Sequence, residues 1–194
     1  RGARAGAGRG AVAAVNELER SAAREDDGQW AAPTGMDESG AIGPRSIGIV
    51  ADVTDQAQVR AMVEQIVREF GRIDILVNNA GGALVPGPSY ASTVPEADFR
   101  RMMDINLMST ILSCQAVAEP MKRQGHGKIV NVGSQAGLRS QGGGGGTAYS
   151  VAKAAIHHYT RQLADELGPF GINVNCIAPG WILSSRAIAG GRTS

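Results

Sequence analysis

The sequence predicts an α/β fold, a doubly wound parallel sheet, from three observations. From residue 46 onward, short apolar segments alternate with longer segments whose apolar residues recur at helical spacing. The apolar segments are rich in Ile and Val, as in strands buried on both faces. Parallel strands need a crossover that is usually helical. The alternation therefore indicates successive β-α-β units.

The first clear strand and helix span residues 46–71. Ser46–Val53 is apolar and ends beside an acid, Asp52. Asp55 is placed to cap the next helix, and Gly71 to end it. The apolar residues of this helix recur at helical spacing: Val59, Met62, Val63, Ile66, Val67 and Phe70.

The middle of the chain supplies a second strand and a long helix. Ile73–Val77 reads as a strand, and residues 78–82, which are two asparagines, an alanine and two glycines, end it. A proline-containing loop follows, and we expect a helix from about Glu96 to Pro120.

Two further strands enclose another helix. Lys128–Val132 is the third strand, and Gly142–Gly146 is expected to be a flexible loop. The next helix carries Tyr149 near its start and runs to about Leu167, where Gly168-Pro169 stops it. Ile172–Ile177 is the fourth strand.

Composition excludes several classes of protein. With 43% hydrophobic and 19% charged residues, the chain reads as soluble and globular. A formal charge of +1 without a basic block gives no indication of nucleic acid. The chain has no apolar run long enough for a membrane span and no signal-peptide pattern. Cys114 and Cys176 are far apart and favour reduced thiols, so we expect a cytoplasmic protein without a metal site.

Tyr149 and Lys153 are the most informative pair of residues. Their spacing of four places both side chains on one helical face, one turn apart. An ammonium beside a phenol favours the phenolate, so we expect the pKa of Tyr149 to fall. Such a phenol is suited to acid/base catalysis near neutral pH, although the motif alone is also compatible with two ordinary helix residues.

Unusual residues follow each strand of the predicted sheet. In open α/β sheets, ligands bind outside the carboxyl ends of the strands. Four clusters lie at such ends: Asp52-Val53, Asn79-Ala80-Gly81, Ser134 and Pro179-Gly180. The start of the Tyr149 helix is expected on the same rim, so the sequence predicts one site there.

In this order and on these elements, the residues resemble the short-chain dehydrogenase/reductase family over about residues 46–183, including its 3-oxoacyl-carrier-protein reductase-like members. The resemblance implies a Rossmann-like sheet and an NAD(P)-dependent oxidoreductase acting on a secondary alcohol or ketone. It also implies a small-molecule substrate, no nucleic acid or membrane partner, and a homo-oligomer, either tetramer or dimer. Association would involve the helix at 96–120 and the Tyr149 helix.

The resemblance assigns catalytic roles to four residues. Tyr149 would exchange a proton with the substrate oxygen. Lys153 would lower the Tyr149 pKa and bind the nicotinamide ribose. Ser134 would hydrogen-bond the reacting oxygen, and Asn106 would hold a water that relays protons from Lys153.

The resemblance also assigns contacts with NAD or NADP. Asp52 would accept a hydrogen bond from the adenine, and Val53 would pack against its ring. Gly81 would line the cofactor because a side chain would collide there. The other expected cofactor contacts, besides Tyr149 and Lys153, are Asn79, Ala80, Pro179, Gly180 and Ile182.

Residues 1–45 depart from the family pattern and allow two alignments. In one, Gly6, Gly8 and Gly10 form the family's phosphate-binding turn. In the other, which we favour, Ala11–Val15 is the family's second strand, and Glu17 binds the adenosine ribose, which slightly favours NAD.

The favoured alignment predicts a domain incomplete at both termini. Residues 1–45 would be an atypical remnant of the first β-α units. Residues 46–194 would form a Rossmann-like domain without the C-terminal lid and last strand. An alternative function is therefore a non-catalytic nucleotide-binding protein or an inactive truncated family member.

Overall fold

A computed structural model describes residues 13–17, 46–83, 89–140 and 145–182. In chain order, the strands are β1 (Ala13–Glu17), β2 (Ser46–Val50), β3 (Ile75–Asn78), β4 (Gly127–Val132) and β5 (Ile172–Ile177). The α-helices are α3 (Gln56–Phe70), α4 (Glu96–Met103), α5 (Ser109–Gln124) and α6 (Thr147–Leu167). The short helices are η1 (Asp104–Met108), η2 (Gln135–Gly137) and η3 (Gly168–Phe170).

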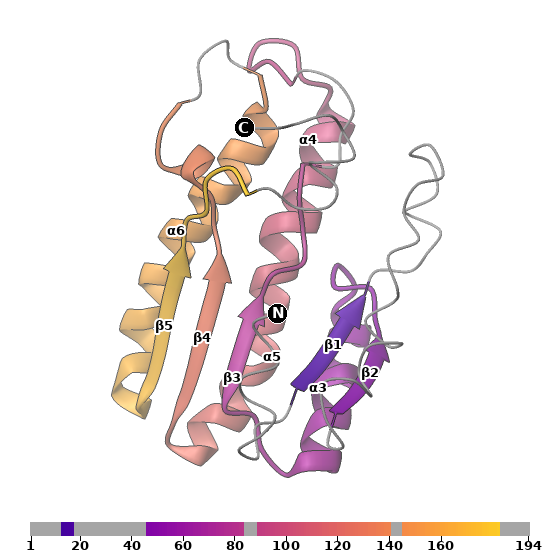
Figure 1. Ribbon diagram of the computed structural model, residues 1–194, viewed down its shortest axis with the longest axis vertical. Helices are drawn as coiled ribbons and strands as arrows, with labels where there is room; N and C mark the ends of the chain where they lie inside the picture. Colours follow the sequence, from indigo (N-terminus) through magenta and orange to yellow (C-terminus); the bar gives the residue numbers. More distant parts are fainter. Residues whose placement is uncertain (1–12, 18–45, 84–88, 141–144, 183–194) are drawn as a thin grey trace.

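All strand pairs are parallel, as the sequence predicted. Pairing of β1 with β2 makes a two-stranded sheet, and a three-stranded sheet has the order β3-β4-β5. The two sheets lie side by side, with β1 on the side of β3 (Figure 1). The carboxyl ends of β3, β4 and β5 consequently lie at one edge, toward the top of Figure 1.

The helices α3, α5 and α6 cover one face of the sheets (Figure 1). One core joins the two sheets to these helices, since Ile49 of β2, Val59 of α3 and Ile129 of β4 are buried in the same cluster. On the other face, side chains of β3 alternate out of this core, and Ile75 and Val77 are exposed.

Sequence signals set the ends of α3. The Asp55 carboxylate accepts hydrogen bonds from Ala57 N and Gln58 N, so it caps the helix as predicted. Gly71 ends the helix with a φ of 77°, a left-handed conformation that favours glycine.

The predicted helix 96–120 is wrong in two respects. A π-helical turn, η1, separates α4 from α5, and α5 continues through Pro120 to Gln124. Met121 is fully buried in the core, and Gly125 provides the left-handed cap one turn later. Burial of Met121 and the cap at Gly125 together explain why the helix continues past a proline that would otherwise end it.

The structure favours the second alignment of the N-terminal segment. A strand at Ala13–Glu17 pairs in parallel with β2, two residues later than the predicted Ala11–Val15, and Glu17 is its last residue. Gly6, Gly8 and Gly10 lie outside the described residues, as does most of the predicted loop at Gly142–Gly146.

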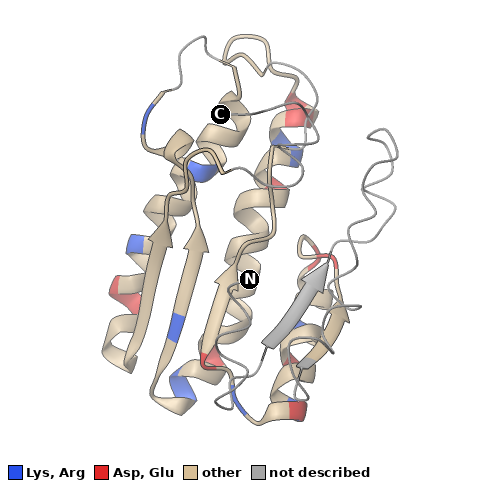
Figure 2. Cartoon of the chain, in the orientation of Figure 1, with Lys and Arg blue, Asp and Glu red and all other residues tan. Residues whose placement is uncertain are grey.

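Charges of both signs are interspersed over the described part of the chain (Figure 2). This distribution agrees with the absence of a basic block in the sequence. Within the described ranges, the helices are all too short or too polar to cross a membrane.

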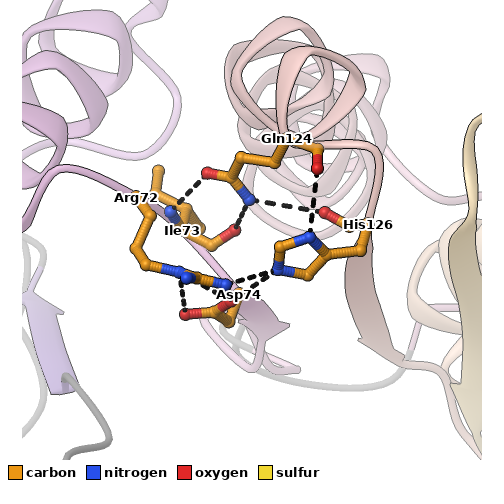
Figure 3. Close-up of polar contacts among 5 residues, drawn as sticks. All are labelled: Arg72, Ile73, Asp74, Gln124 and His126. Carbon is orange, nitrogen blue, oxygen red and sulfur yellow. Dashed lines mark hydrogen bonds and ion pairs between the residues drawn. The ribbon is translucent and has the colours of Figure 1, made fainter.

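A polar cluster joins the segments before β3 and β4, at the amino ends of these strands (Figure 3). Asp74 Oδ1 lies 2.5 Å from Arg72 Nη2 and 2.8 Å from His126 Nε2. Gln124 accepts from Ile73 N at 2.9 Å and donates to Ile73 O at 2.7 Å. The loop before β3 is thereby tied to the loop before β4.

Replacing Asp74 by Asn should lower the melting temperature at neutral pH by no more than about 4 °C, because the interactions are half-exposed. Hydrogen bonds from Arg72, and then from His126, hold the pKa of Asp74 below its usual range. The stabilisation is therefore present above the unfolded-state pKa of about 4 and is lost as pH falls through the folded-state pKa.

Thermal unfolding of wild type and Asp74→Asn across the acid range measures this difference. Asp165→Asn, which changes an exposed carboxylate on α6, is the control and should show no such loss. A deficit in Asp74→Asn that persists unchanged below the folded-state pKa would contradict the assignment.

Candidate active site

The ends of β4 and β5 are fastened together where the sequence placed two of its clusters. Gly133 N donates to Ile177 O at 2.8 Å, and Gln135 N donates to Pro179 O at 3.0 Å. A Cβ at Gly180 would lie 3.1 Å from the Gln135 side chain. The segments after β4 and β5 therefore run side by side, which brings Ser134 and Pro179-Gly180 together.

Ser134 is held in an extended conformation at the start of η2. Its Oγ accepts a hydrogen bond from Ala136 N at 3.1 Å. Within the described residues, the Ser134 hydroxyl makes this hydrogen bond alone, and it does so as the acceptor. Its own hydrogen can therefore be donated to another group. A donor in this orientation can bind the oxygen of a substrate.

The first turn of α6 places Tyr149. The helix begins after Gly146, whose φ is 82°, and Ser89 supplies partners for its first amides. Ser89 O accepts from Thr147 N at 2.8 Å, and Ser89 Oγ accepts from Ala148 N at 3.3 Å. Tyr149 is half-buried on the helix that packs beside η2 and β5.

Lys153 connects α6 to the end of β4. Its ammonium donates to Val132 O at 2.8 Å and lies 5.6 Å from the centroid of the Tyr149 ring. The residue is only 4% exposed. Lys153 therefore lies next to Tyr149, as predicted, with its position set by the backbone two residues before Ser134.

Burial lowers the pKa of Lys153, and the nearby Cys176 thiol opposes that change. Desolvation disfavours a charged amine, so the proton is held less tightly than on an exposed lysine. This direction suits a group that takes part in proton transfer.

Close backbone packing supports the same corner. A Cβ at Gly137 would lie 2.6 Å from Ala154 N and 2.6 Å from the carbonyl carbon of Lys153. Glycine is required because the backbone of η2 rests directly on the backbone of α6. This contact fixes the spacing between the Ser134 turn and the helix that carries Tyr149.

Asn106 is fully buried in η1 and joins that turn to the segment after β3. Its Oδ1 accepts from Gly82 N at 3.0 Å, and its Nδ2 donates to Gly82 O and to Met102 O, each at 3.0 Å. The side chain therefore fastens the chain at Gly82, and the predicted water relay stays a prediction.

Contacts within the protein itself require glycine at position 81. Its φ is 133°, and a Cβ there would lie 2.7 Å from Asn106 Oδ1. The sequence predicted that a side chain would collide with a cofactor. In the structure, a side chain at this position would collide with Asn106, so Gly81 is needed for the fold of the segment after β3.

A network of polar side chains links β3, β4 and α6 next to the site. Asn78 Nδ2 donates to Asn131 Oδ1 at 2.8 Å, and Asn131 Nδ2 donates to Thr160 Oγ1 at 3.0 Å. Asn78 also contacts Cys114, where burial raises the thiol pKa to about 12. Such a thiol is unreactive. These bonds join β3, β4 and α6.

The predicted adenine contacts follow β2. Asp52 Oδ1 accepts from Thr54 N at 2.8 Å and from Thr54 Oγ1 at 2.7 Å, which stabilises the turn before α3. The Val53 side chain is 2% exposed and belongs to the core, so its backbone is what remains for a cofactor contact. The adenine contact of each residue stays a prediction.

The remaining predicted cofactor residues also lie at the carboxyl edge. Asn79 and Gly180 are exposed, and Ala80 and Pro179 are half-buried. Ile182 is 66% exposed. The sequence did not indicate the contributions of Gly137, Asn131 and Thr160, because the contacts of each residue are with elements distant in the sequence.

Comparison with known proteins identifies the family. The family model for the short chain dehydrogenases matches residues 2–190. The chain belongs to the short chain dehydrogenase family. Its parallel sheet and flanking helices agree with that fold, so the predicted family and the predicted fold class are both confirmed.

Among relatives of this short chain dehydrogenase, cyclohexanol dehydrogenase of Rhodococcus sp. (strain TK6) is 48% identical over 79% of this chain and 57% of its own length. The 3-oxoacyl-[acyl-carrier-protein] reductase of Escherichia coli (strain K12) is 35% identical over 73% of this chain and 56% of its length. The chain thus spans just over half of these relatives.

A solved structure of a 7α-hydroxysteroid dehydrogenase with NADH and 7-oxo glycochenodeoxycholic acid is also similar. Its TM-score is 0.73 at 33% identity, covering 91% of this chain and 64% of that one. A nicotinamide cofactor is therefore consistent with the family, without a choice between NAD and NADP.

Replacing Asn106 by Asp should lower the free energy of unfolding by about 3 kcal/mol or more. The change is isosteric but sets a carboxylate against the carbonyl oxygens of Gly82 and Met102, which Nδ2 now satisfies. Urea denaturation measures the loss.

The matched control is Asn175→Asp at an exposed position of β5, which should change stability little. Wild-type stability in Asn106→Asp would show that the described contacts of Asn106 do not hold the segment after β3.

Proposed function

We propose that this chain forms the catalytic part of a nicotinamide-dependent oxidoreductase that interconverts a secondary alcohol and a ketone. The observation that carries the proposal is the position of the Lys153 ammonium. The ammonium is buried next to the Tyr149 ring. It donates to the carbonyl of Val132, the residue two positions before Ser134.

Tyr149 is the proposed general acid/base. In the oxidative direction it takes the proton of the substrate hydroxyl, and in the reductive direction it returns that proton. Lys153 is the proposed partner of Tyr149 in this exchange, with its ammonium 5.6 Å from the centroid of the Tyr149 ring. A bound nicotinamide cofactor accepts or delivers the hydride, and that chemistry belongs to the cofactor.

Ser134 is proposed to orient the reacting oxygen. Its Oγ already accepts from Ala136 N, so the hydroxyl proton can donate to the substrate. That hydrogen bond strengthens as negative charge develops on the oxygen. Asn106 supports the site by fixing the segment after β3, with the proton relay through water as a further proposed role.

The residues at the strand ends fit a nicotinamide nucleotide. The Lys153 ammonium has three N–H donors and, within the described chain, donates one hydrogen bond, to Val132 O. Donors remain for ribose hydroxyls. Glu17 ends β1, and a carboxylate at that strand end favours NAD over NADP through the adenosine ribose.

Exposed apolar residues near the site support an apolar substrate. Leu138, just after η2, is 62% exposed, and Trp181 and Ile182, after Gly180, are 79% and 66% exposed. Cyclohexanol, named in one relative, has the required combination of an apolar ring and a secondary hydroxyl.

Association between copies is part of the proposal. Met108, just before α5, and Val151 on α6 are 38% and 41% exposed. Apolar residues exposed near these two helices support the interface that the family resemblance implied. A dimer or tetramer in solution is the expected state.

Replacing Tyr149 by Phe should lower kcat by about 10²–10⁴-fold, because the proton donor and acceptor is removed. Dissociation constants for NADH and NADPH should change far less than kcat, because Tyr149 is one of several expected cofactor contacts. Turnover of cyclohexanol and other apolar secondary alcohols with NAD⁺ or NADP⁺, followed by absorbance of the reduced cofactor, measures the first effect, and calorimetry measures the second.

Tyr159→Phe is the matched control, since Tyr159 lies on the same helix, ten residues after Tyr149, and its hydroxyl contacts the buried Cys114. It should retain turnover. Full activity in Tyr149→Phe would overturn the role assigned to Tyr149. If the wild-type protein bound cofactor but turned over no substrate, a non-catalytic nucleotide-binding protein would be favoured.

A further inference from the structure

The face of α6 that carries Tyr149 and Lys153 continues to His157, one turn beyond Lys153. His157 is half-buried, and its Nε2 lies 3.1 Å from Ser134 O and 3.4 Å from Ser134 N. A histidine without a place in the family pattern therefore contacts the backbone of the residue expected to bind the substrate oxygen.

The two contacts of His157 require different tautomers. Nε2 donates to Ser134 O when it carries a hydrogen and accepts from Ser134 N when it does not. The carbonyl contact is shorter, at 3.1 Å against 3.4 Å. The shorter distance favours the tautomer with a hydrogen on Nε2, which makes His157 a donor to Ser134 O.

The space beside Gly133 shows how closely the ring is fitted. A Cβ at Gly133 would lie 2.5 Å from His157 Cε1, 2.7 Å from Nε2 and 2.8 Å from Cys176 Sγ. The imidazole therefore rests against bare backbone, and the absence of a side chain at Gly133 is what allows it to reach Ser134.

Two successive turns of α6 thus hold the chain on either side of Gly133. Lys153 binds the carbonyl before it, at 2.8 Å, and His157 binds the carbonyl after it, at 3.1 Å. Because Ser134 Oγ is oriented through Ala136 N, the direction of its hydroxyl depends on the backbone that these two side chains fix.

We propose that His157 is a positioning residue that orients Ser134 for catalysis by donating a hydrogen bond from Nε2 to Ser134 O. The proposal rests on the proposed oxidoreductase function. A small displacement of a group that contacts the reacting atoms can cost a large factor in rate. His157 would act through Ser134 and not on the substrate itself.

Two amide substitutions separate hydrogen bonding from packing. In His157→Gln the amide nitrogen is as many bonds from the backbone as Nε2, so it can replace the donor. In His157→Asn the amide is one bond shorter and cannot. His158→Asn is the control, because His158 is exposed on the same helix and contacts Arg161.

Steady-state kinetics should show kcat about 10-fold or more lower in His157→Asn, within about 3-fold of wild type in His157→Gln, and unchanged in His158→Asn. KM for the cofactor should change little. Wild-type kcat in His157→Asn, or an equal loss in His157→Gln, would overturn the proposal.

Nitrogen NMR of the histidine side chains provides a readout that does not depend on turnover. The signal missing in His157→Gln identifies His157, and we expect its hydrogen on Nε2. A hydrogen on Nδ1 alone would refute the hydrogen bond to Ser134 O. If wild type lacked dehydrogenase activity, the proposed function would fail, and the tautomer would still decide this contact.

Discussion

The hydrogen bond from the Lys153 ammonium to Val132 O is the contact on which the arrangement of the site depends. It joins the helix that carries Tyr149 to the strand that leads to Ser134. Burying an amine costs free energy, which is seen in its lowered pKa, and the carbonyl offsets part of that cost. Lys153, which is proposed to act with Tyr149, therefore also has a structural role.

The rest of the carboxyl edge is built in a similar way, with side chains bonded to backbone. Asn106 holds Gly82, Ser89 holds the first amides of α6, and His157 reaches Ser134. Beneath them, Asn131 bridges Asn78 of β3 and Thr160 of α6. Buried polar networks of this kind specify one arrangement when every group has a partner, and within the described chain the buried side-chain polar atoms all have one.

Local signals made much of this fold predictable. The caps at Asp55 and Gly71, the stop at Gly168-Pro169 and the β5 limits at Ile172–Ile177 agree with the structure. The end of α5 was mispredicted because burial of Met121 depends on tertiary packing, which outweighed the local effect of Pro120. Spacing placed Tyr149 and Lys153 on one helical face.

The contacts that orient the site could not be predicted in the same way. His157 meets Ser134 across 23 residues of sequence, and Asn106 meets Gly82 across 24. Each depends on how α6 or η1 lies against the strand ends. A histidine or asparagine within a helix gives no local indication of such a partner.

Turnover of Lys153→Met, measured together with its stability, tests most directly whether the Lys153 ammonium and its bond to Val132 O are needed at the site. Met keeps most of the side-chain volume but removes the charge and the bond to Val132 O. We expect kcat to be about 10²-fold or more below wild type. The free energy of unfolding should fall by about 1–3 kcal/mol, which is the cost of leaving one buried carbonyl without a hydrogen bond. Wild-type turnover in folded Lys153→Met would show that neither the ammonium nor its bond to Val132 O is needed for activity.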